Sequence, residues 1–209
     1  LTPELHPALL IFNGKREGLY YLLQRPRRRE WVSRFGHTNF VMHAQKRTLD
    51  PQGLALHEEL VCWARNVDKT MTLKDAERYV DTDYLSRWIF NMIYCGATDA
   101  YQGPGIMDLS EARPRWRWLV WDIDHAFARI YPRHSLTHIW EKDNWNLALR
   151  LPGGAGYNFV TLSRWDARGV IFSRLMNESP EYRENFIKLA MDLLNHRITE
   201  AFAAERVAH

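Results

Sequence analysis

Two apolar runs near the start of the chain are separated by a turn signal. Leu9–Phe12 and Leu19–Leu23 are apolar, and Asn13-Gly14 lies between them. An Asn-Gly pair flanked by apolar runs is the strongest short-range signal for two antiparallel strands joined by a tight turn. The pattern therefore predicts a β-hairpin over residues 9–24.

Beyond the hairpin, apolar residues recur at helical spacing. The clearest example is the segment 84–95, in which positions i, i+3, i+4, i+7 and i+8 are all apolar. The same periodicity, with proline at helix-start positions, predicts helices over residues 54–67 and 180–204. Two short apolar runs joined by a polar stretch predict a second hairpin at about residues 105–121. We therefore expect an α+β domain, a mainly helical body with short β-hairpins.

Composition limits the class of protein. The chain has 209 residues, of which 46% are hydrophobic and 13% aromatic; this suffices for one large domain and excludes general disorder. The mean hydropathy is −0.43 and no long uncharged apolar run occurs, so we expect no membrane-spanning helix and no membrane partner. With 28 basic and 25 acidic residues, the net charge of +3 does not suggest a dedicated nucleic-acid binder.

The basic residues and the cysteines refine this picture. Arginine accounts for 22 of the 28 basic residues, and its planar guanidinium suits fixed contacts with carboxylates and aromatic rings. The two cysteines, Cys62 and Cys95, are a poor basis for a disulfide framework or a zinc site. Both lie on apolar helical faces, which indicates core positions.

The most informative stretch is an apolar strand that ends in two carboxylates. Trp118–Trp121 leads directly to Asp122 and Asp124. A buried carboxylate without a partner is costly, and a divalent cation removes that cost. Carboxylate oxygens favour Mg²⁺ or Mn²⁺. On spacing alone, the alternative that both carboxylates pair with neighbouring arginines is equally well supported.

A second acidic position lies in a loop, 23 residues before Asp122. Here Asp99 is either a turn-capping residue, as is common beside glycine, or a carboxylate held near the metal site. Protein kinases show the same order of helix, loop Asp, hairpin and second Asp; their loop Asp receives the proton of the acceptor hydroxyl, and the second Asp binds metal. We expect Asp99, Asp122 and Asp124 to converge on one cleft and to share a cation.

Several short segments gain meaning from their order along the chain. They are Asn13-Gly14, Gly18-Leu19-Tyr20, Cys95 to Asp99, Trp118 to Asp124, and Phe172 to Phe186. In this order they resemble the CotH family, which comprises atypical, kinase-like proteins named after a spore coat protein. The most specific mark of the family is the WDxD element after a Trp-rich strand, here Trp121 to Asp124.

The resemblance implies a fold and an activity. The fold is a divergent protein-kinase-like one, in which residues 1–24 are the end of the N-lobe with the hinge hairpin and residues 25–209 are the helical C-lobe with the acidic metal site. The activity is transfer of the ATP γ-phosphoryl group to Ser or Thr of a protein substrate, with Mg²⁺ or Mn²⁺. The family name also implies association with a spore coat or a cell surface.

The same resemblance gives individual residues their roles. Asp99 is the catalytic residue, Asp122 is a metal ligand, and Asp124 is a second acidic ligand or its support. Gln102 stands near the position where the family usually carries Asn, so it is the candidate for the second metal contact. Gln24 occupies a hinge-like position where Glu is frequent, and it is the candidate nucleotide contact.

Two other functions remain open at this point. A degenerate kinase-like module would bind a partner without transferring phosphate. It is favoured by Gln102 in place of Asn and by the expectation that most of the N-lobe is missing from these 209 residues, so that the phosphate-binding lysine cannot be assigned and Lys46 is only a substitute. A nucleotide-sugar transferase also uses Asp-x-Asp, but it requires an open parallel α/β sheet that the helix-rich second half does not supply.

Overall fold

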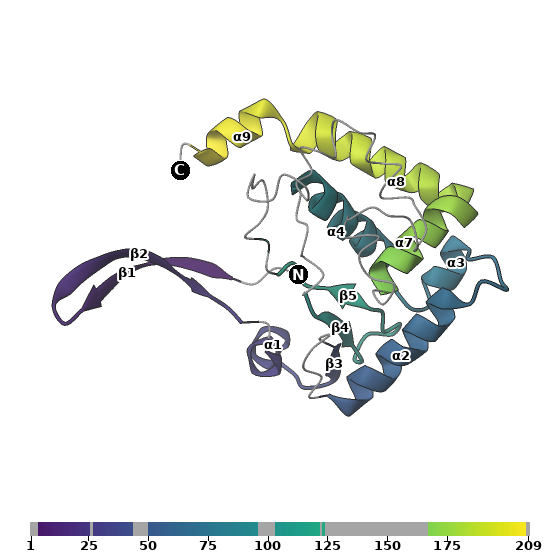
Figure 1. Cartoon of the computed structure of the whole chain (residues 1–209), viewed down its shortest axis with the longest axis horizontal. Helices are drawn as coiled ribbons and strands as arrows, with labels where there is room; N and C mark the ends of the chain where they lie inside the picture. Colours follow the sequence, from purple (N-terminus) through teal and green to yellow (C-terminus); the bar gives the residue numbers. More distant parts are fainter. Residues whose placement is uncertain are drawn as a thin grey trace, which may run out of the picture.

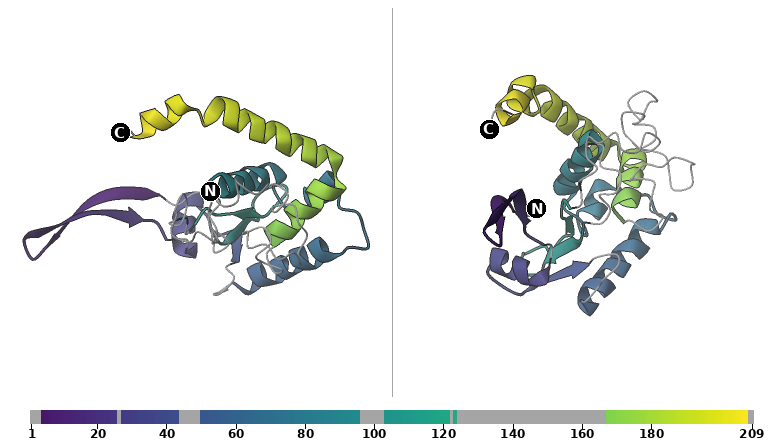
Figure 2. Two further views of the ribbon diagram at one scale, coloured as in Figure 1. Left: turned by 45° about the horizontal axis from the view of Figure 1, so that its top comes forward. Right: turned by 60° about the vertical axis from the view of Figure 1, so that its left-hand side comes forward.

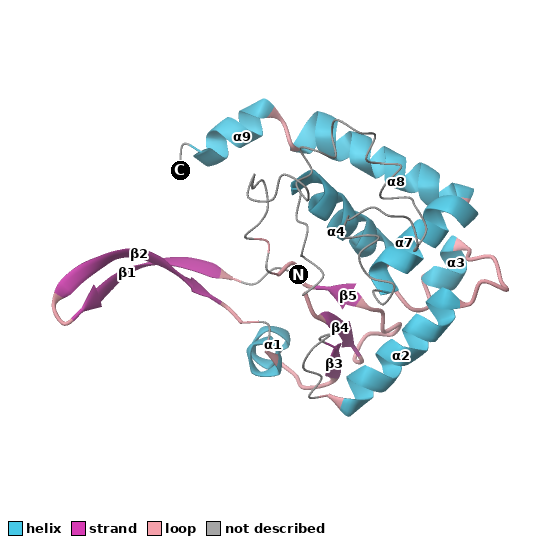
Figure 3. Cartoon of the chain, viewed as in Figure 1, coloured by secondary structure: helices cyan, strands magenta, loops and turns pink. Residues whose placement is uncertain are grey.

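The computed structural model describes residues 4–25, 27–43, 50–95, 103–121, 123 and 167–207. Over these residues the chain mixes helices with small antiparallel sheets, as expected for an α+β fold (Figure 3). A two-stranded hairpin extends from a body that consists of a three-stranded sheet and most of the helices (Figure 1).

The predicted N-terminal hairpin is confirmed and is longer than expected. Strand β1 (Leu5–Phe12) pairs antiparallel with β2 (Lys15–Leu23), with one irregularity in register between Leu10 and Ile11. The turn is made by Asn13 and Gly14, both at positive φ (50° and 76°), which is the conformation that favours this residue pair in two-residue hairpins. The strand β1 includes Pro7, which is tolerated because an edge strand needs no further donor there.

The hairpin buries almost nothing. The left view of Figure 2 shows it extending away from the body. Neighbouring residues of a strand point to opposite faces, so the consecutive apolar residues of β2 place apolar side chains on both faces. Ten large apolar side chains of the hairpin are 40–67% exposed: Leu5, Leu9, Leu10, Ile11, Phe12, Leu19, Tyr20, Tyr21, Leu22 and Leu23. The hairpin thus carries the residues of a buried sheet without the cover that such a sheet needs.

The sheet of the body has the order β3-β4-β5 and is antiparallel throughout. Its strands are β3 (Phe40–His43), β4 (Gly105–Asp108) and β5 (Arg117–Trp118). The pair β4–β5 confirms the second predicted hairpin. The strand β3 was not expected from the sequence, because four residues are too few to show a period.

The helices near residues 54–67 and 84–95 are confirmed as α2 (Pro51–Arg65) and α4 (Thr82–Cys95). The segment 180–204 is not one helix. It contains α8 (Pro180–Asp192), the π-helical turn η2 (Leu193–Arg197) and α9 (Glu200–Val207). The described chain also contains α1 (Arg28–Phe35), α3 (Leu73–Ala76) and α7 (Ala167–Glu178).

The interruption after α8 has a local cause. The amide of Ile198 donates to the carbonyl of Leu193 (2.7 Å), and Ile198 leaves helical geometry (φ −100°, ψ 60°). The hydroxyl of Thr199 then accepts a hydrogen bond from the amide of Phe202 (3.2 Å), as the N-cap of a new helix does. Thr199 therefore starts a new helix, although the helical spacing of apolar residues continues across it.

The main core surrounds α4. Its buried face (Leu85, Trp88, Ile89, Met92 and Ile93) packs with buried residues of α2, α7 and α8. A smaller cluster, formed by Trp31, Phe40, Ile106 and Leu119, packs α1 against the sheet. One core prediction was wrong, because Cys62 is exposed and Cys95 is only half-buried. Within the described ranges, no helix combines the length and the apolarity needed to cross a bilayer.

The exposure of the hairpin predicts the effect of a charge on β2. In the 209-residue chain, Leu19→Lys should reduce self-association, because it interrupts an apolar face and an unpaired strand edge. It should change the free energy of unfolding by less than about 0.5 kcal/mol, since Leu19 is 67% exposed. Light scattering and denaturant unfolding measure the two effects.

The control is Leu60→Ala, at a fully buried site, which should lower the free energy of unfolding by about 2–5 kcal/mol. A similar loss for Leu19→Lys would contradict an uncovered hairpin.

Candidate functional site

Most of the predicted site residues lie outside the described part of the chain. These are Asp99, Gln102, Asp122 and Asp124, together with Lys46. Their convergence therefore stays a prediction. The structure does describe the residues that flank the two acidic stretches: Cys95 and Gly103 on either side of the Asp99 loop, and Trp121 and Ile123 on either side of Asp122.

The flanks of the two acidic stretches meet at one end of the β4–β5 pair. The amide of Leu119 donates to the carbonyl of Pro104 (3.0 Å), and Gly105 pairs with Trp118. An added Cβ at Gly105 would lie 3.1 Å from both the Trp116 and the Trp118 side chains, so the start of β4 packs directly on two indole rings. The residues that follow the Asp99 loop are thus in contact with the strand that leads to Asp122.

Helix α4, which ends just before the Asp99 loop, holds the same strand. The indole Nε1 of Trp88 donates to the carbonyl of Leu119 (3.3 Å), and the hydroxyl of Tyr84 donates to the carbonyl of Trp118 (2.8 Å). Burial raises the pKa of Tyr84, so its hydroxyl stays a neutral donor at ordinary pH. Two side chains of one helix therefore fix the backbone at the end of β5.

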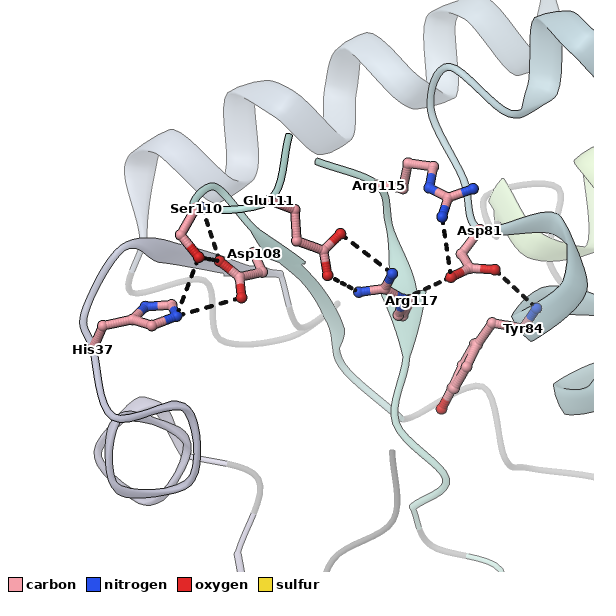
Figure 4. Close-up of polar contacts among 8 residues, drawn as sticks. All are labelled: His37, Asp81, Tyr84, Asp108, Ser110, Glu111, Arg115 and Arg117. Atoms are coloured by element: carbon pink, nitrogen blue, oxygen red, sulfur yellow. Dashed lines mark hydrogen bonds and ion pairs between the residues drawn. The ribbon is translucent and has the colours of Figure 1, made fainter. Parts of the chain in front are cut away.

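The N-terminus of α4 is joined to β5 by an ion-pair network (Figure 4). One carboxylate oxygen of Asp81 accepts from the amide of Tyr84 (3.1 Å), and the other accepts from Nε of Arg117 (2.8 Å). The guanidinium of Arg117 also donates to Glu111 (2.5 and 3.2 Å), and Arg115 lies 3.7 Å from Asp81. The sequence indicates Asp81 or Asp83 as the cap of this helix but gives no sign of the pairing with β5.

The network determines the ionisation of Asp81. Burial alone would raise its pKa. The amide of Tyr84 and the guanidinium groups of Arg117 and Arg115 outweigh burial, so the pKa of Asp81 lies below the ordinary aspartate value. The carboxylate is therefore charged at neutral pH.

A Ser–His–Asp group lies at the other end of the sheet (Figure 4). A catalytic triad uses the two imidazole nitrogens separately, one toward the acid and one toward the nucleophile. Here the same nitrogen, Nε2 of His37, faces both Asp108 (3.4 Å) and Ser110 (3.3 Å), while the Ser110 hydroxyl donates to Asp108 (2.6 Å). The group therefore joins the segment after α1 to β4 and lacks the geometry of a hydrolase triad.

Gln24 is the one predicted site residue that the structure describes. Its side-chain oxygen accepts from the amide of Glu4 (3.3 Å), and its own amide donates to the Glu4 carbonyl (2.9 Å). Both contacts extend the hairpin by one pair at its open end. The predicted nucleotide contact of Gln24 is not tested by these contacts.

Among the described residues, no three His, Cys, Asp or Glu side chains lie close enough to hold a metal ion. This does not test the metal prediction, because the three aspartates concerned are not described. The predicted ligands Asp122, Asp124 and Gln102 suit the predicted metal: two carboxylates and one amide oxygen are hard ligands, which Mg²⁺ and Mn²⁺ prefer.

The sequence model of one protein family, described as CotH kinase protein, matches residues 1–209. The match covers the hairpin, the sheet and the helices alike, so it concerns the whole chain and not a single motif. No curated protein matches the chain.

The Asp81 network predicts a pH-dependent loss of stability. Asp81→Asn should lower the free energy of unfolding by about 1–3 kcal/mol at neutral pH, because Arg117 loses a charged partner in a mostly buried position. The pKa of Asp81 is depressed in the folded state, so its contribution is present above the unfolded value of 3.8 and is lost as the pH falls below it. Urea unfolding from pH 7 to pH 3 should therefore show the difference in stability between the two proteins narrow as the pH falls below 3.8.

A matched control is available in the same helix. The side chain of Asp83 is 72% exposed and pairs with Arg87 on the surface (2.9 Å). Asp83→Asn should cost less than about 0.5 kcal/mol at every pH. An equal cost for both variants would show that the Asp81 network does not join α4 to β5 in solution.

Proposed function

The chain belongs to the CotH kinase protein family, and from that premise we propose that it transfers the γ-phosphoryl group of ATP to a Ser or Thr hydroxyl of a protein substrate. The observation that carries the proposal is the meeting of the two acidic flanks. Pro104, after the Asp99 loop, accepts a hydrogen bond from Leu119, three residues before Asp122. A kinase needs its loop Asp and its metal-binding Asp side by side, and this contact supports that arrangement.

The proposed roles follow the chemistry of each side chain. Asp99 orients the acceptor hydroxyl and receives its proton, which a carboxylate can do when it is within hydrogen-bond reach. Asp122, Asp124 and Gln102 would hold Mg²⁺ or Mn²⁺ through oxygen atoms. When bound, the metal neutralises charge that develops on the phosphate oxygens. The β4–β5 pair and α4 keep the flanks of these residues at a fixed spacing.

The proposal includes a kinase-like division of the chain. The helical body, residues 25–209, would be the C-lobe, and the hairpin with the rest of residues 1–24 would be the end of the N-lobe and the hinge. Apolar residues on both faces of the hairpin support this, because they suit a strand pair inside a larger sheet. Gln24 would contact the nucleotide where the hairpin joins the body. By the family resemblance, the protein would associate with a spore coat or a cell surface.

A second function is favoured by one residue of the sequence. The family usually carries Asn shortly after the loop Asp, and this chain has Gln102 as the nearest polar candidate. If Gln102 does not support a second metal ion, the chain would bind nucleotide or a partner protein without transfer.

Two substitutions separate catalysis from binding. Asp122→Ala should abolish metal-dependent ATP consumption, because the nucleotide loses its principal metal ligand. Asp99→Ala should slow transfer about 10²- to 10⁴-fold and leave nucleotide affinity intact, because its role is limited to the acceptor hydroxyl. Phosphate incorporation into a Ser/Thr substrate and calorimetric affinity for MnATP provide the two readouts.

The control is Asp83→Ala, an exposed aspartate of α4, which should leave both quantities unchanged. Equal activity of Asp122→Ala and the unmodified chain would refute the catalytic assignment. Binding of MnATP without any transfer by the unmodified chain would refute the kinase and favour the binding module.

A further inference from the structure

A charged side chain lies buried where the acidic flanks meet. Arg168, in the first turn of α7, is only 2% exposed. Its guanidinium carbon lies 4.6 Å from the centroid of the Trp88 ring and 5.9 Å from that of Trp118. One of its terminal nitrogens donates to the carbonyl of Gly103 (3.4 Å). Removing a guanidinium from water costs free energy, so a buried arginine needs well-placed partners to offset that cost.

Each of these partners belongs to a segment that leads to the proposed site. Gly103 follows the Asp99 loop directly, and Trp118 lies on the strand that leads to Asp122. Trp88 lies on α4, whose last residue precedes the Asp99 loop. Arg168 thus joins α7 to the described segments that border both acidic stretches, through two aromatic faces and one carbonyl.

A second buried arginine of the same helix has different surroundings. Arg174 is 5% exposed, and its guanidinium donates to the carbonyls of Ala64, Asn66 and Lys69 and to Glu178. All of these partners lie at the end of α2, in the loop after it and on α7 itself. The two residues are alike in burial and charge, and they differ in what they contact.

We infer that Arg168 is a positioning residue of the phosphotransfer site, an assignment that rests on the proposed function. It keeps Gly103 and Trp118 in one arrangement, so that the Asp99 and Asp122 stretches leave the sheet at a constant spacing. The planar guanidinium can lie over an indole ring and donate a hydrogen bond in its own plane, so it can hold both segments at once. The compact ammonium of lysine has no plane with which to contact the ring in this way. Misplacement by about 1 Å is enough to cost about 10²-fold in rate.

The test compares Arg168 with Arg174. Arg168→Met removes the charge, and Arg168→Lys keeps it in case the Met variant does not fold. Arg174→Met and Arg174→Lys are the matched controls. The rate constant kcat is expressed per MnATP-binding site, so that a loss of folded protein does not appear as a loss of rate. Both Arg168 variants should lower kcat about 10- to 100-fold, whereas the Arg174 variants should lower Tm and leave kcat per site unchanged.

Hydrogen exchange gives a readout that does not depend on activity. The amide of Leu119, which donates to Pro104, should exchange about tenfold faster in the Arg168 variants. In the Arg174 variants exchange should increase more at residues 64–71 than at Leu119. An unmodified chain that transfers no phosphate refutes the proposed function, and Arg168 is then judged by exchange at Leu119 alone. Unchanged exchange at Leu119, or a kcat per site equal to that of the unmodified chain, would overturn the assignment of Arg168.

Discussion

The body of the protein depends on one buried guanidinium. Arg174, in the middle of α7, donates to the carbonyls of Ala64 (3.0 Å) and Asn66 (2.8 Å) and also to that of Lys69. These carbonyls lie at the C-terminal end of α2 and just beyond it, where a helix leaves its last carbonyls without partners and where a positive charge is favourable. Glu178, one turn later on α7, pairs with the same guanidinium (2.7 Å) and keeps its charge balanced.

The Arg174–Glu178 pair also holds the segment that precedes α3. Glu178 also accepts the amide of Met71 (2.6 Å), and the hydrogen bond from Arg174 lowers the pKa of its carboxyl. The loop between α2 and α3 is therefore fixed at both ends by one ion pair of α7. With that loop fixed, α7 packs against α2, α4 and α8, and the aromatic contact of Phe172 with Phe186 (4.9 Å between ring centroids) joins it to α8.

The sequence predicts those elements whose signal is a local pattern of residues. The hairpin, α2, α4 and α8 carry local signals: a turn pair, a proline at the helix start, or an apolar face that alternates with a polar one. Helix α7 carries none, because residues 167–176 are all buried, and a helix buried on every side has no amphipathic period. The described partners of Arg168 and the carbonyls that Arg174 contacts lie far away in the sequence; only Glu178, at i+4 from Arg174, is local, and an i,i+4 pair alone does not identify a buried residue.

The predicted acidic site is also only partly predictable from local sequence patterns. The order of Asp99 and Asp122 predicts a kinase-like site, but order alone does not say what holds the described flanks of the two stretches together. The strand β5 is only two residues long, and two ladder pairs cannot by themselves fix the direction in which the chain continues.

Side chains of α4, and the residue that precedes it, supply what the short strand lacks. Asp81 pairs with Arg117, Tyr84 donates to Trp118, and Trp88 donates to Leu119. These three contacts follow the helix along three consecutive residues of β5 and its extension. The same helix ends at Cys95, directly before the stretch that holds Asp99, so a shift of α4 would move the described flanks of both acidic stretches together. For the proposed phosphotransfer, whose rate would depend on the spacing between a hydroxyl-orienting carboxylate and a metal-binding one, this common attachment of the two flanks is what the described structure supplies.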